Sequence, residues 1–226
     1  NPWFMCLIPT EVVREIGLSL PLFIKWDDSE YGVRAQEAGF PTITLPGAAV
    51  WHVPWTDKND ALDWQAYFHH RNRFIAALLH SPFPHGGRLI WESLNHQIKH
   101  MLAMQYSTVE LRHRALMDVL GGPERLHAEI GTKLAEVREF RASFPDAQLS
   151  GDPDAFPPVR HSKPPRRSDT SMIPSRPSQL VSAVLGGLRQ FRGVRALSRE
   201  FPERNVPTMD ARWYHLATLD SAIVSM

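Results

Sequence analysis

The sequence predicts an α/β segment followed by a mainly α-helical region. Up to about residue 56, short apolar runs of strand length alternate with helical patterns, as they do in α/β proteins. From Asp60 to His80, apolar residues recur at helical spacing instead, and further helical patterns follow. We therefore expect one domain over 1–56 and a separate helical domain over 57–145.

Two helices are expected in the α/β segment. The first has Thr10 as its N-cap residue and ends before Gly17. The second begins at the acidic run 27–30 and ends at Gly39. Four extended segments of strand-like composition flank these helices: 5–9, 22–26, 41–45 and 48–53.

Four helices are expected in the helical domain, over about 60–80, 87–105, 107–120 and 124–144. The sequence Ser107-Thr108-Val109-Glu110 fits a capping box at the start of the third. Residues 146–178 contain seven of the 19 prolines and are predicted to be a linker. In the last segment, 179–226, a helix is expected to about residue 198, and the loose alternation over 211–224 favours strands.

The composition is that of an ordinary globular chain, with 226 residues, 43% hydrophobic residues and a net charge of +1. So small a net charge produces no overall field that would recruit nucleic acid, and we expect no nucleic-acid partner. The single cysteine, Cys6, excludes a disulfide framework and a cysteine-rich zinc site, and it is typical of a reducing compartment.

No run of about 18 apolar residues occurs, so we expect no transmembrane helix. No signal peptide is recognised either. The chain starts at Asn1 rather than at methionine, and it closes on an apolar run, 221–226, that reads like an interrupted strand. We therefore expect both ends to lie within a longer protein.

Asp27 and Asp28 form the pattern with the most chemical content. They open a helix directly after a strand-like segment, at a place where backbone N–H groups and the helix dipole favour anions. The edge of an α/β sheet is also the usual place for a ligand. One carboxylate can cap the helix while the other accepts a proton. The alternative is an ordinary capping box between Asp27 and Glu30, which is the more common outcome for such a pattern alone.

Two other patterns carry candidate residues. His52 ends an apolar segment, where a neutral imidazole can bind a metal, although a lone histidine there is more often a core residue. His69, Asn72 and Arg73 share one face of a helix, which either presents His69 and Arg73 to a sugar or phosphate or is a solvated polar face. Aromatic residues that can stack on sugar rings, at least half of them expected in the core, are Trp3, Phe4, Trp26, Trp51, Trp55 and Trp64.

Longer runs carry a family resemblance: residues 5–9, 23–28, 44–52, 63–69, 205–208 and 210–213. They resemble the polymerising galactofuranosyltransferases of mycobacterial-type galactan synthesis, which are family 2 glycosyltransferases of the GT-A fold. The resemblance covers nearly the whole chain and is weakest across 146–178. It implies that 1–56 is the C-terminal part of a GT-A nucleotide-sugar transferase domain, followed by a mainly helical C-terminal domain.

The resemblance also implies roles for individual residues. Asp28 corresponds to the catalytic base, and Asp27 to a neighbour that helps hold the acceptor. His52 corresponds to a metal ligand. Phe4 stands where the family tends to have a second tryptophan, which removes one indole N–H donor from the acceptor site. The residues implied in acceptor binding are Trp3, Trp55 and His69.

The implied reaction is an inverting transfer of galactofuranose from UDP-galactofuranose to a lipid-linked galactan of the arabinogalactan cell wall. Mn²⁺ is the expected cofactor, with Mg²⁺ as the alternative, because one imidazole among oxygen ligands suits manganese better. The resemblance further implies a homo-oligomer in peripheral contact with the cytoplasmic face of the cell membrane. The family's Asp-rich nucleotide and metal motif is absent from these residues, so the chain alone is expected to be inactive.

Two alternatives remain open. Another family 2 cell-wall enzyme, such as a rhamnosyl- or glucosyltransferase, would use the same base and metal ligand with a different donor. A non-catalytic carbohydrate-binding or assembly module would use the aromatic residues for binding and the two aspartates only as a helix cap. Placement of Asp28 and His52 in one open crevice would favour catalysis.

Overall fold

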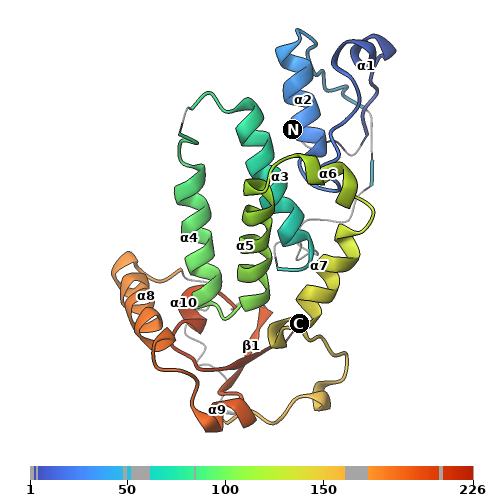
Figure 1. Cartoon of the computed structure of the whole chain (residues 1–226). Helices are drawn as coiled ribbons and strands as arrows, with labels where there is room; N and C mark the ends of the chain where they lie inside the picture. The colour runs from blue at the N-terminus through green and yellow to red at the C-terminus, as the bar shows by residue number, and fades with distance from the viewer. Residues whose placement is uncertain are drawn as a thin grey trace. The chain divides into compact units, whose positions relative to one another are not determined.

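The computed structural model describes residues 3, 5–47, 50–51, 62–83, 85–160, 173–208 and 211–225 (Figure 1). The chain forms two compact units: the first is Asn1–Glu92 with Ser107–Ala147, and the second is Ser93–Tyr106 with Gln148–Met226. In chain order, the elements are α1 (Thr10–Ile16), α2 (Asp27–Glu37), α3 (Gln65–His80), α4 (Leu89–Leu102), α5 (Tyr106–Leu120), α6 (Glu124–Glu129), α7 (Lys133–Ala142), the 3-10 helices η2 (Pro145–Ala147) and η3 (Pro153–Ala155), α8 (Arg176–Gln190), α9 (Ala196–Glu200), β1 (Arg204–Pro207), α10 (Trp213–Leu216) and β2 (Ala222–Ser225).

The main core of the first unit joins α3, α5 and α7. Tyr67 and Phe68 from α3 pack with Leu111 and Ala115 from α5 and with Val137 from α7, and all five are fully buried. Burial of one large apolar side chain contributes roughly 1.5–3 kcal/mol. The helices expected over 60–80, 87–105 and 107–120 are confirmed as α3, α4 and α5, with boundaries that differ by a few residues.

Three details of the expected helices are wrong. Thr10 is the first residue of α1 rather than its N-cap, which is Pro9, and no side chain caps this helix. The helix expected to run to about residue 144 is two helices, α6 and α7, because residues 130–132 form a turn between them. Ser107 does not cap α5 through Glu110. Its backbone N–H and its hydroxyl both donate to the Asp146 carboxylate, the latter at 2.6 Å. Asp146 thus takes the place of Glu110 as the acceptor of the Ser107 N–H.

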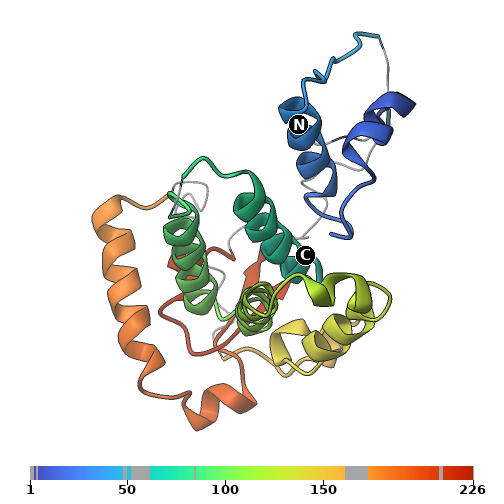
Figure 2. The ribbon, with the colours of Figure 1, turned by 45° about the horizontal axis from the view of Figure 1, so that its top comes forward.

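A smaller core joins α1 to α2, the two blue helices that lie beside each other in Figure 2. Val12 packs there against Tyr31 and Ala35. Gly17 has a φ of 79° and ends α1, as predicted. The Tyr31 hydroxyl donates to the Gly17 carbonyl at 3.2 Å, and the end of α1 is thereby fastened to α2.

The strands expected in the first 56 residues do not form in the described part of that segment. Met5 and Leu7 are 68% and 94% exposed, so 5–9 is not a buried strand. Segment 22–26 turns sharply instead of extending, and 41–45 is irregular. Only residues 50 and 51 of 48–53 are described, and they form no strand. A strand requires a neighbour that pairs its backbone groups, and the described residues of this segment provide none.

A charge cluster centred on the buried Lys133 lies beside the main core of the first unit. The Lys133 side chain is 3% exposed, and its ammonium contacts Glu129, Glu136 and Asp118. The Tyr67 hydroxyl donates to the same Asp118 carboxylate. Burial, aided by this hydrogen bond, raises the pKa of Tyr67 far above its usual range. Burial lowers the pKa of Lys133, but its carboxylate partners outweigh this effect, and the net shift is upward.

These two shifts predict a loss of stability in alkali. Tyr67 and Lys133 both hold their protons more tightly in the folded chain, and folding therefore takes up protons once the pH exceeds about 10. The free energy of unfolding should then fall as the pH rises. Calorimetry between about pH 8 and 11 should show this fall, and Tyr67→Phe should make it shallower. An equally steep fall in Tyr67→Phe would contradict the assignment.

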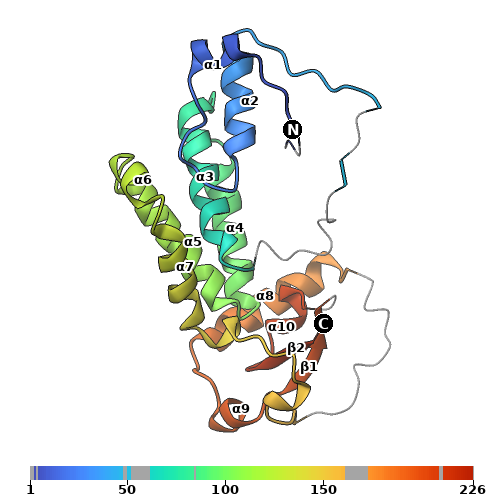
Figure 3. The ribbon, with the colours of Figure 1, turned by 90° about the vertical axis from the view of Figure 1, so that its right-hand side faces the viewer.

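The second unit contains a two-stranded parallel sheet, β1 paired with β2, which Figure 3 shows with α8 and α10. Val206, Ala103 and Leu216 form its core. Strand formation in the tail is confirmed for β2, whereas residues 213–216 form α10 instead. The helix expected to about residue 198 is α8, which ends at Gln190 and is followed by the short helix α9.

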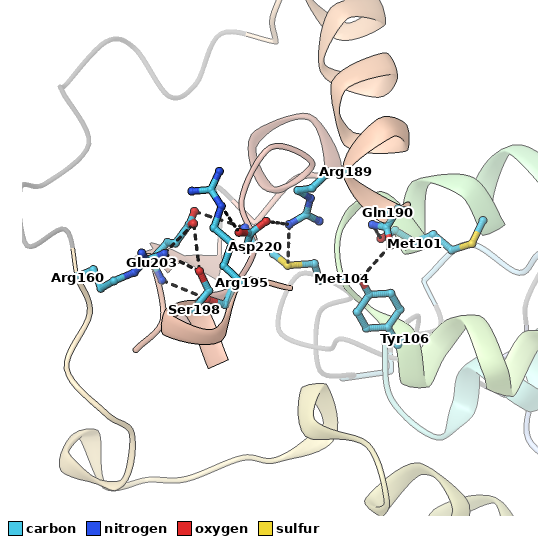
Figure 4. Close-up of polar contacts among 11 residues, drawn as sticks. Met101, Met104, Tyr106, Arg160, Arg189, Gln190, Arg195, Ser198, Glu203 and Asp220 are labelled. Atoms are coloured by element: carbon cyan, nitrogen blue, oxygen red, sulfur yellow. Dashed lines mark hydrogen bonds and ion pairs between the residues drawn. The ribbon is translucent and has the colours of Figure 1, made fainter. Parts of the chain in front are cut away.

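Ion pairs fasten the segments of the second unit together (Figure 4). Arg189 of α8 lies 3.7 Å from Asp220, and Arg195 contacts the other oxygen of the same carboxylate. Arg160 donates to Ser198 at 2.6 Å and to Glu203 at 2.8 Å. The proline-rich segment is thus anchored at Arg160, and residues 161–172 lie outside the described part of the chain.

Candidate functional site

The candidate site is built around the bend that precedes α2. Phe23, Ile24 and Trp26 have φ values of 58°, 58° and 68°, so three residues with side chains adopt the left-handed conformation. This conformation is uncommon for residues that carry a Cβ atom and is most unusual for β-branched isoleucine. The bend ends at Trp26, and Asp27 and Asp28 follow at once as the first residues of α2.

Two buried residues of α3 contact the carbonyls of this bend. Asn72 is fully buried, and its amide nitrogen lies 2.7 Å from the carbonyl oxygens of Leu22 and Lys25 and 3.1 Å from that of Phe23. Arg71 donates to the Leu22 carbonyl at 2.7 Å. It also donates through Nε to Asn72 Oδ1 at 2.9 Å. The sequence does not indicate this contact, since helical spacing predicts that Asn72 lies on a face open to a ligand or to solvent.

The Asp28 carboxylate binds the backbone of Trp3. Its Oδ2 accepts the Trp3 N–H at 2.8 Å, and its Oδ1 accepts the N–H and the hydroxyl of Ser29 at 2.7 and 3.3 Å. The Trp3 indole meets the Tyr31 ring edge-on at 6.0 Å and lies over Gly32. A carboxylate oxygen can accept two hydrogen bonds, so Oδ2 keeps capacity for one further donor. Two predicted site residues, Asp28 and Trp3, therefore lie together.

The capping box considered for Asp27 and Glu30 does not form, since the N-cap residue of α2 is Trp26 and no side-chain hydrogen bond caps the helix there. Glu30 is buried and binds Arg34 at 2.9 Å and His80 at 3.2 Å instead. These partners come from α2 itself and from the end of α3. The two aspartates are thus not explained by a local cap.

His69 lies on the same side of α3 as this bend. Its ring meets the Trp26 indole edge-on, with 5.8 Å between ring centroids, and its side chain is exposed. Trp26 is the residue directly before Asp27. The structure therefore brings four predicted site residues to the start of α2: Asp27, Asp28, Trp3 and His69.

The other two predicted residues, His52 and Trp55, lie outside the described residues. Trp51, directly before them, is 91% exposed. Within the described ranges, no group of three or more histidine, cysteine, aspartate or glutamate side chains is placed to hold a metal ion. The described residues alone therefore do not form the expected metal site, and the placement of His52 with Asp28 stays a prediction.

Arg73 has a protein partner rather than an open face. Its guanidinium forms an ion pair with Glu92 of α4 at 2.8 Å. Burial, together with the charge of Arg73, lowers the pKa of neighbouring Arg112 to about 10. The interpretation of Arg73 as a residue presented to a sugar or phosphate therefore has no support in these contacts.

The helix α8 exposes a row of large apolar side chains. Leu180, Val184 and Leu188 are 66%, 53% and 61% exposed, and Phe191, at the end of the helix, is 89% exposed. Three arginines follow within the next turns: Arg192, Arg195 and Arg199. Among the helices of the described ranges, none is both long enough and apolar enough to cross a bilayer.

Comparison with protein families finds two matches. Residues 89–226 match the family described as galactofuranosyltransferase-2, domain 3. Residues 4–77, which contain the bend and both aspartates, match the glycosyltransferase-like family 2. The two matches divide the chain at the start of α4.

Curated relatives extend over the whole chain. It is 44% identical over 225 residues to galactofuranosyltransferase GlfT2 of Mycolicibacterium smegmatis and 42% identical over 234 residues to galactofuranosyltransferase GlfT2 of Mycobacterium tuberculosis. Both alignments cover 100% of this chain but only 34% and 35% of the relatives. The chain therefore spans about a third of the length of the curated relatives that it matches.

Proposed function

The chain belongs to the galactofuranosyltransferase-2 family, and from this premise we propose that it is part of an inverting galactofuranosyltransferase. UDP-galactofuranose is the proposed donor, and a growing lipid-linked galactan of the cell wall is the proposed acceptor. The observation that carries the proposal is the gathering of Asp28, Trp3 and His69 around the start of α2. The comparisons support the reaction class through the names of the relatives.

In the proposed reaction, Asp28 acts as the general base. The acceptor hydroxyl occupies the remaining capacity of Oδ2 and gives its proton to this carboxylate. The hydroxyl oxygen then forms a bond to the anomeric carbon from the face opposite UDP. The bond between that carbon and the diphosphate oxygen breaks, UDP leaves with the electron pair, and the anomeric configuration inverts.

Acceptor binding is assigned to the aromatic residues beside the base. Trp3 and Trp55 would stack on the apolar faces of sugar rings, while His69 and Asp27 would bind hydroxyl groups. His52 is proposed to bind a divalent cation, preferably manganese, through one imidazole nitrogen. Such a cation, when bound, neutralises the charge that develops on the leaving diphosphate. Within the described residues, no group of three or more histidine, cysteine, aspartate or glutamate side chains is placed to hold this cation without His52.

The proposal is tested by the release of UDP from UDP-galactofuranose by the full-length protein. A galactofuranosyl disaccharide serves as acceptor, and manganese is compared with a chelator. Turnover that depends on manganese supports donor, acceptor class and cofactor together. Turnover with UDP-glucose or a nucleotide-linked rhamnose alone would instead favour another family 2 cell-wall enzyme. A folded protein that binds galactan without turnover of any donor would favour the carbohydrate-binding module.

Contact with the cell membrane is proposed for α8. Its exposed apolar residues can enter the interface of a bilayer, and the arginines that follow match the charge of anionic lipid. Localisation at the cytoplasmic face and assembly into a homo-oligomer belong to the same proposal. Sedimentation of the purified full-length protein tests the oligomer.

Substitution of both Val184 and Leu188 by aspartate is expected to lower binding to anionic phospholipid vesicles at least about tenfold, because each apolar contact is replaced by a repelled charge. Co-sedimentation with the vesicles measures the change. Leu120→Asp, at the end of α5 and 71% exposed in wild type, is the matched control and should bind as wild type does. Equal binding by the double variant and the control would exclude α8 as the contact.

A further inference from the structure

The bend before α2 requires an external restraint. Phe23, Ile24 and Trp26 hold left-handed backbone conformations that steric contacts with Cβ disfavour. Strained backbone of this kind persists only where the surrounding structure holds it in place. Within the bend itself, the Lys25 N–H donates to the Phe23 carbonyl at 2.8 Å. The remaining restraint has to come from elsewhere in the fold.

Asn72 provides this restraint from α3. An amide nitrogen carries two hydrogens, and the Asn72 nitrogen faces three carbonyls of the bend, so its donors are fully used. The Arg71 Nε–H donates to Asn72 Oδ1 and thereby fixes which side of the amide faces the bend. Arg71 also donates to the Leu22 carbonyl. Both side chains are almost completely buried, so water does not compete for these bonds.

The held carbonyls lead directly into the site. The carbonyl of Lys25 is two residues before Asp27 and three before Asp28, and no glycine intervenes. Asp28 in turn holds the backbone of Trp3. A shift of the bend therefore moves Asp28, the proposed base, together with Trp3, which is proposed to bind the acceptor. Misplacement of a catalytic group by about 1 Å can lower the rate about 10²-fold.

We propose that Asn72 and Arg71 are positioning residues that set the place of Asp28 through the carbonyls of residues 22–25. The proposal rests on the proposed function, because it assigns Asp28 as the base. It differs from a purely structural role for Asn72 in one respect. A structural anchor would lower stability alone, whereas a positioning residue lowers kcat in protein that remains folded.

The experiment compares three variants in the full-length protein. Asn72→Leu keeps the branched shape of the side chain and removes the donors. Arg71→Lys keeps the positive charge but removes the planar set of guanidinium N–H donors. It serves as the milder variant if Asn72→Leu does not fold. Ser107→Ala removes one buried hydrogen bond, from the Ser107 hydroxyl to Asp146 at the start of α5, and is the matched control. Steady-state kinetics with UDP-galactofuranose and hydrogen exchange of amides 22–29 are the two measurements.

The expected result for Asn72→Leu is a kcat roughly 10²-fold lower, with the donor KM changed less than about threefold. Exchange in amides 22–29 should become at least about tenfold faster. Arg71→Lys should change both quantities in the same direction by less, and Ser107→Ala should change neither. Unchanged exchange in the bend overturns the proposal, and so does faster exchange with unchanged kcat. Inactive wild-type protein would remove the proposed function, while the exchange data would still decide whether Asn72 holds the bend.

Discussion

Replacement of Asp28 by asparagine is expected to lower kcat roughly 10²- to 10⁴-fold in the full-length protein, which is the usual contribution of a general base. Asparagine has nearly the same shape but cannot take the proton of an acceptor hydroxyl. Its amide can still accept the Ser29 N–H through one oxygen. The loss should therefore appear in a protein whose fold and thermal transition match those of wild type.

The neighbouring carboxylate provides the matched comparison. Asp27→Asn removes a charge one residue away, and acceptor binding rather than proton transfer is proposed for Asp27. This variant is expected to raise the acceptor KM and to change kcat much less than Asp28→Asn does. The difference between the two variants separates a base from a general requirement for negative charge. A loss below about tenfold in Asp28→Asn would remove the base assignment.

A second effect of Asp28→Asn follows from the contact with Trp3. The carboxylate oxygen that accepts the Trp3 N–H becomes either an amide nitrogen, which cannot accept this bond, or the single remaining oxygen. In the first case, the Trp3 backbone loses its partner. The acceptor KM of Asp28→Asn should then rise, in addition to the expected fall in kcat. Ser29→Ala, which removes only the weaker hydroxyl bond to the same carboxylate, should leave both nearly unchanged.

The helices of this chain were largely predictable from the sequence, and the strands of its first part were not. Apolar periodicity located α3, and helix start and stop residues located α2 and α5, because both kinds of signal are local in sequence. Apolar runs such as 5–9 and 22–26 have the composition of strands, but pairing is a property of two segments. The left-handed turn at 23–26 had no signal at all, since none of its residues is glycine.

Two capping-box patterns were misleading in the same way. Asp27-x-x-Glu30 and Ser107-x-x-Glu110 both match the pattern, and neither box forms. In each case, the side chain has other partners: Arg34 and His80 for Glu30, and Asp146 for Ser107. Local propensity was overruled by tertiary contacts. The role of Asn72 could not be predicted for the same reason: its three acceptors lie 47 to 50 residues away, so the local sequence carries no signal of them.

The second large effect is expected in the second unit, where Gly186→Ala should destabilise the packing of α8 by about 1–3 kcal/mol. A Cβ atom at Gly186 would lie 2.7 Å from Ala217 Cβ, 2.9 Å from the Ala217 carbonyl oxygen and 2.9 Å from Leu102 Cδ2. One of these neighbours is backbone and cannot rotate away. Because alanine is favoured over glycine in a helix by about 1 kcal/mol, the steric cost must exceed that gain.

The adjacent glycine is a control within the same helix. Gly187 has nothing within 4 Å of an added Cβ, so Gly187→Ala should stabilise α8 by about 0.5–1 kcal/mol. The same substitution at two successive positions is thus expected to have opposite signs. Native-state hydrogen exchange of amides in α8 and α10 measures both changes locally in the full-length protein. If Gly186→Ala were as stable as Gly187→Ala, α8 would not pack against Ala217 as described, and the exposed apolar row assigned to membrane contact would lose its orientation.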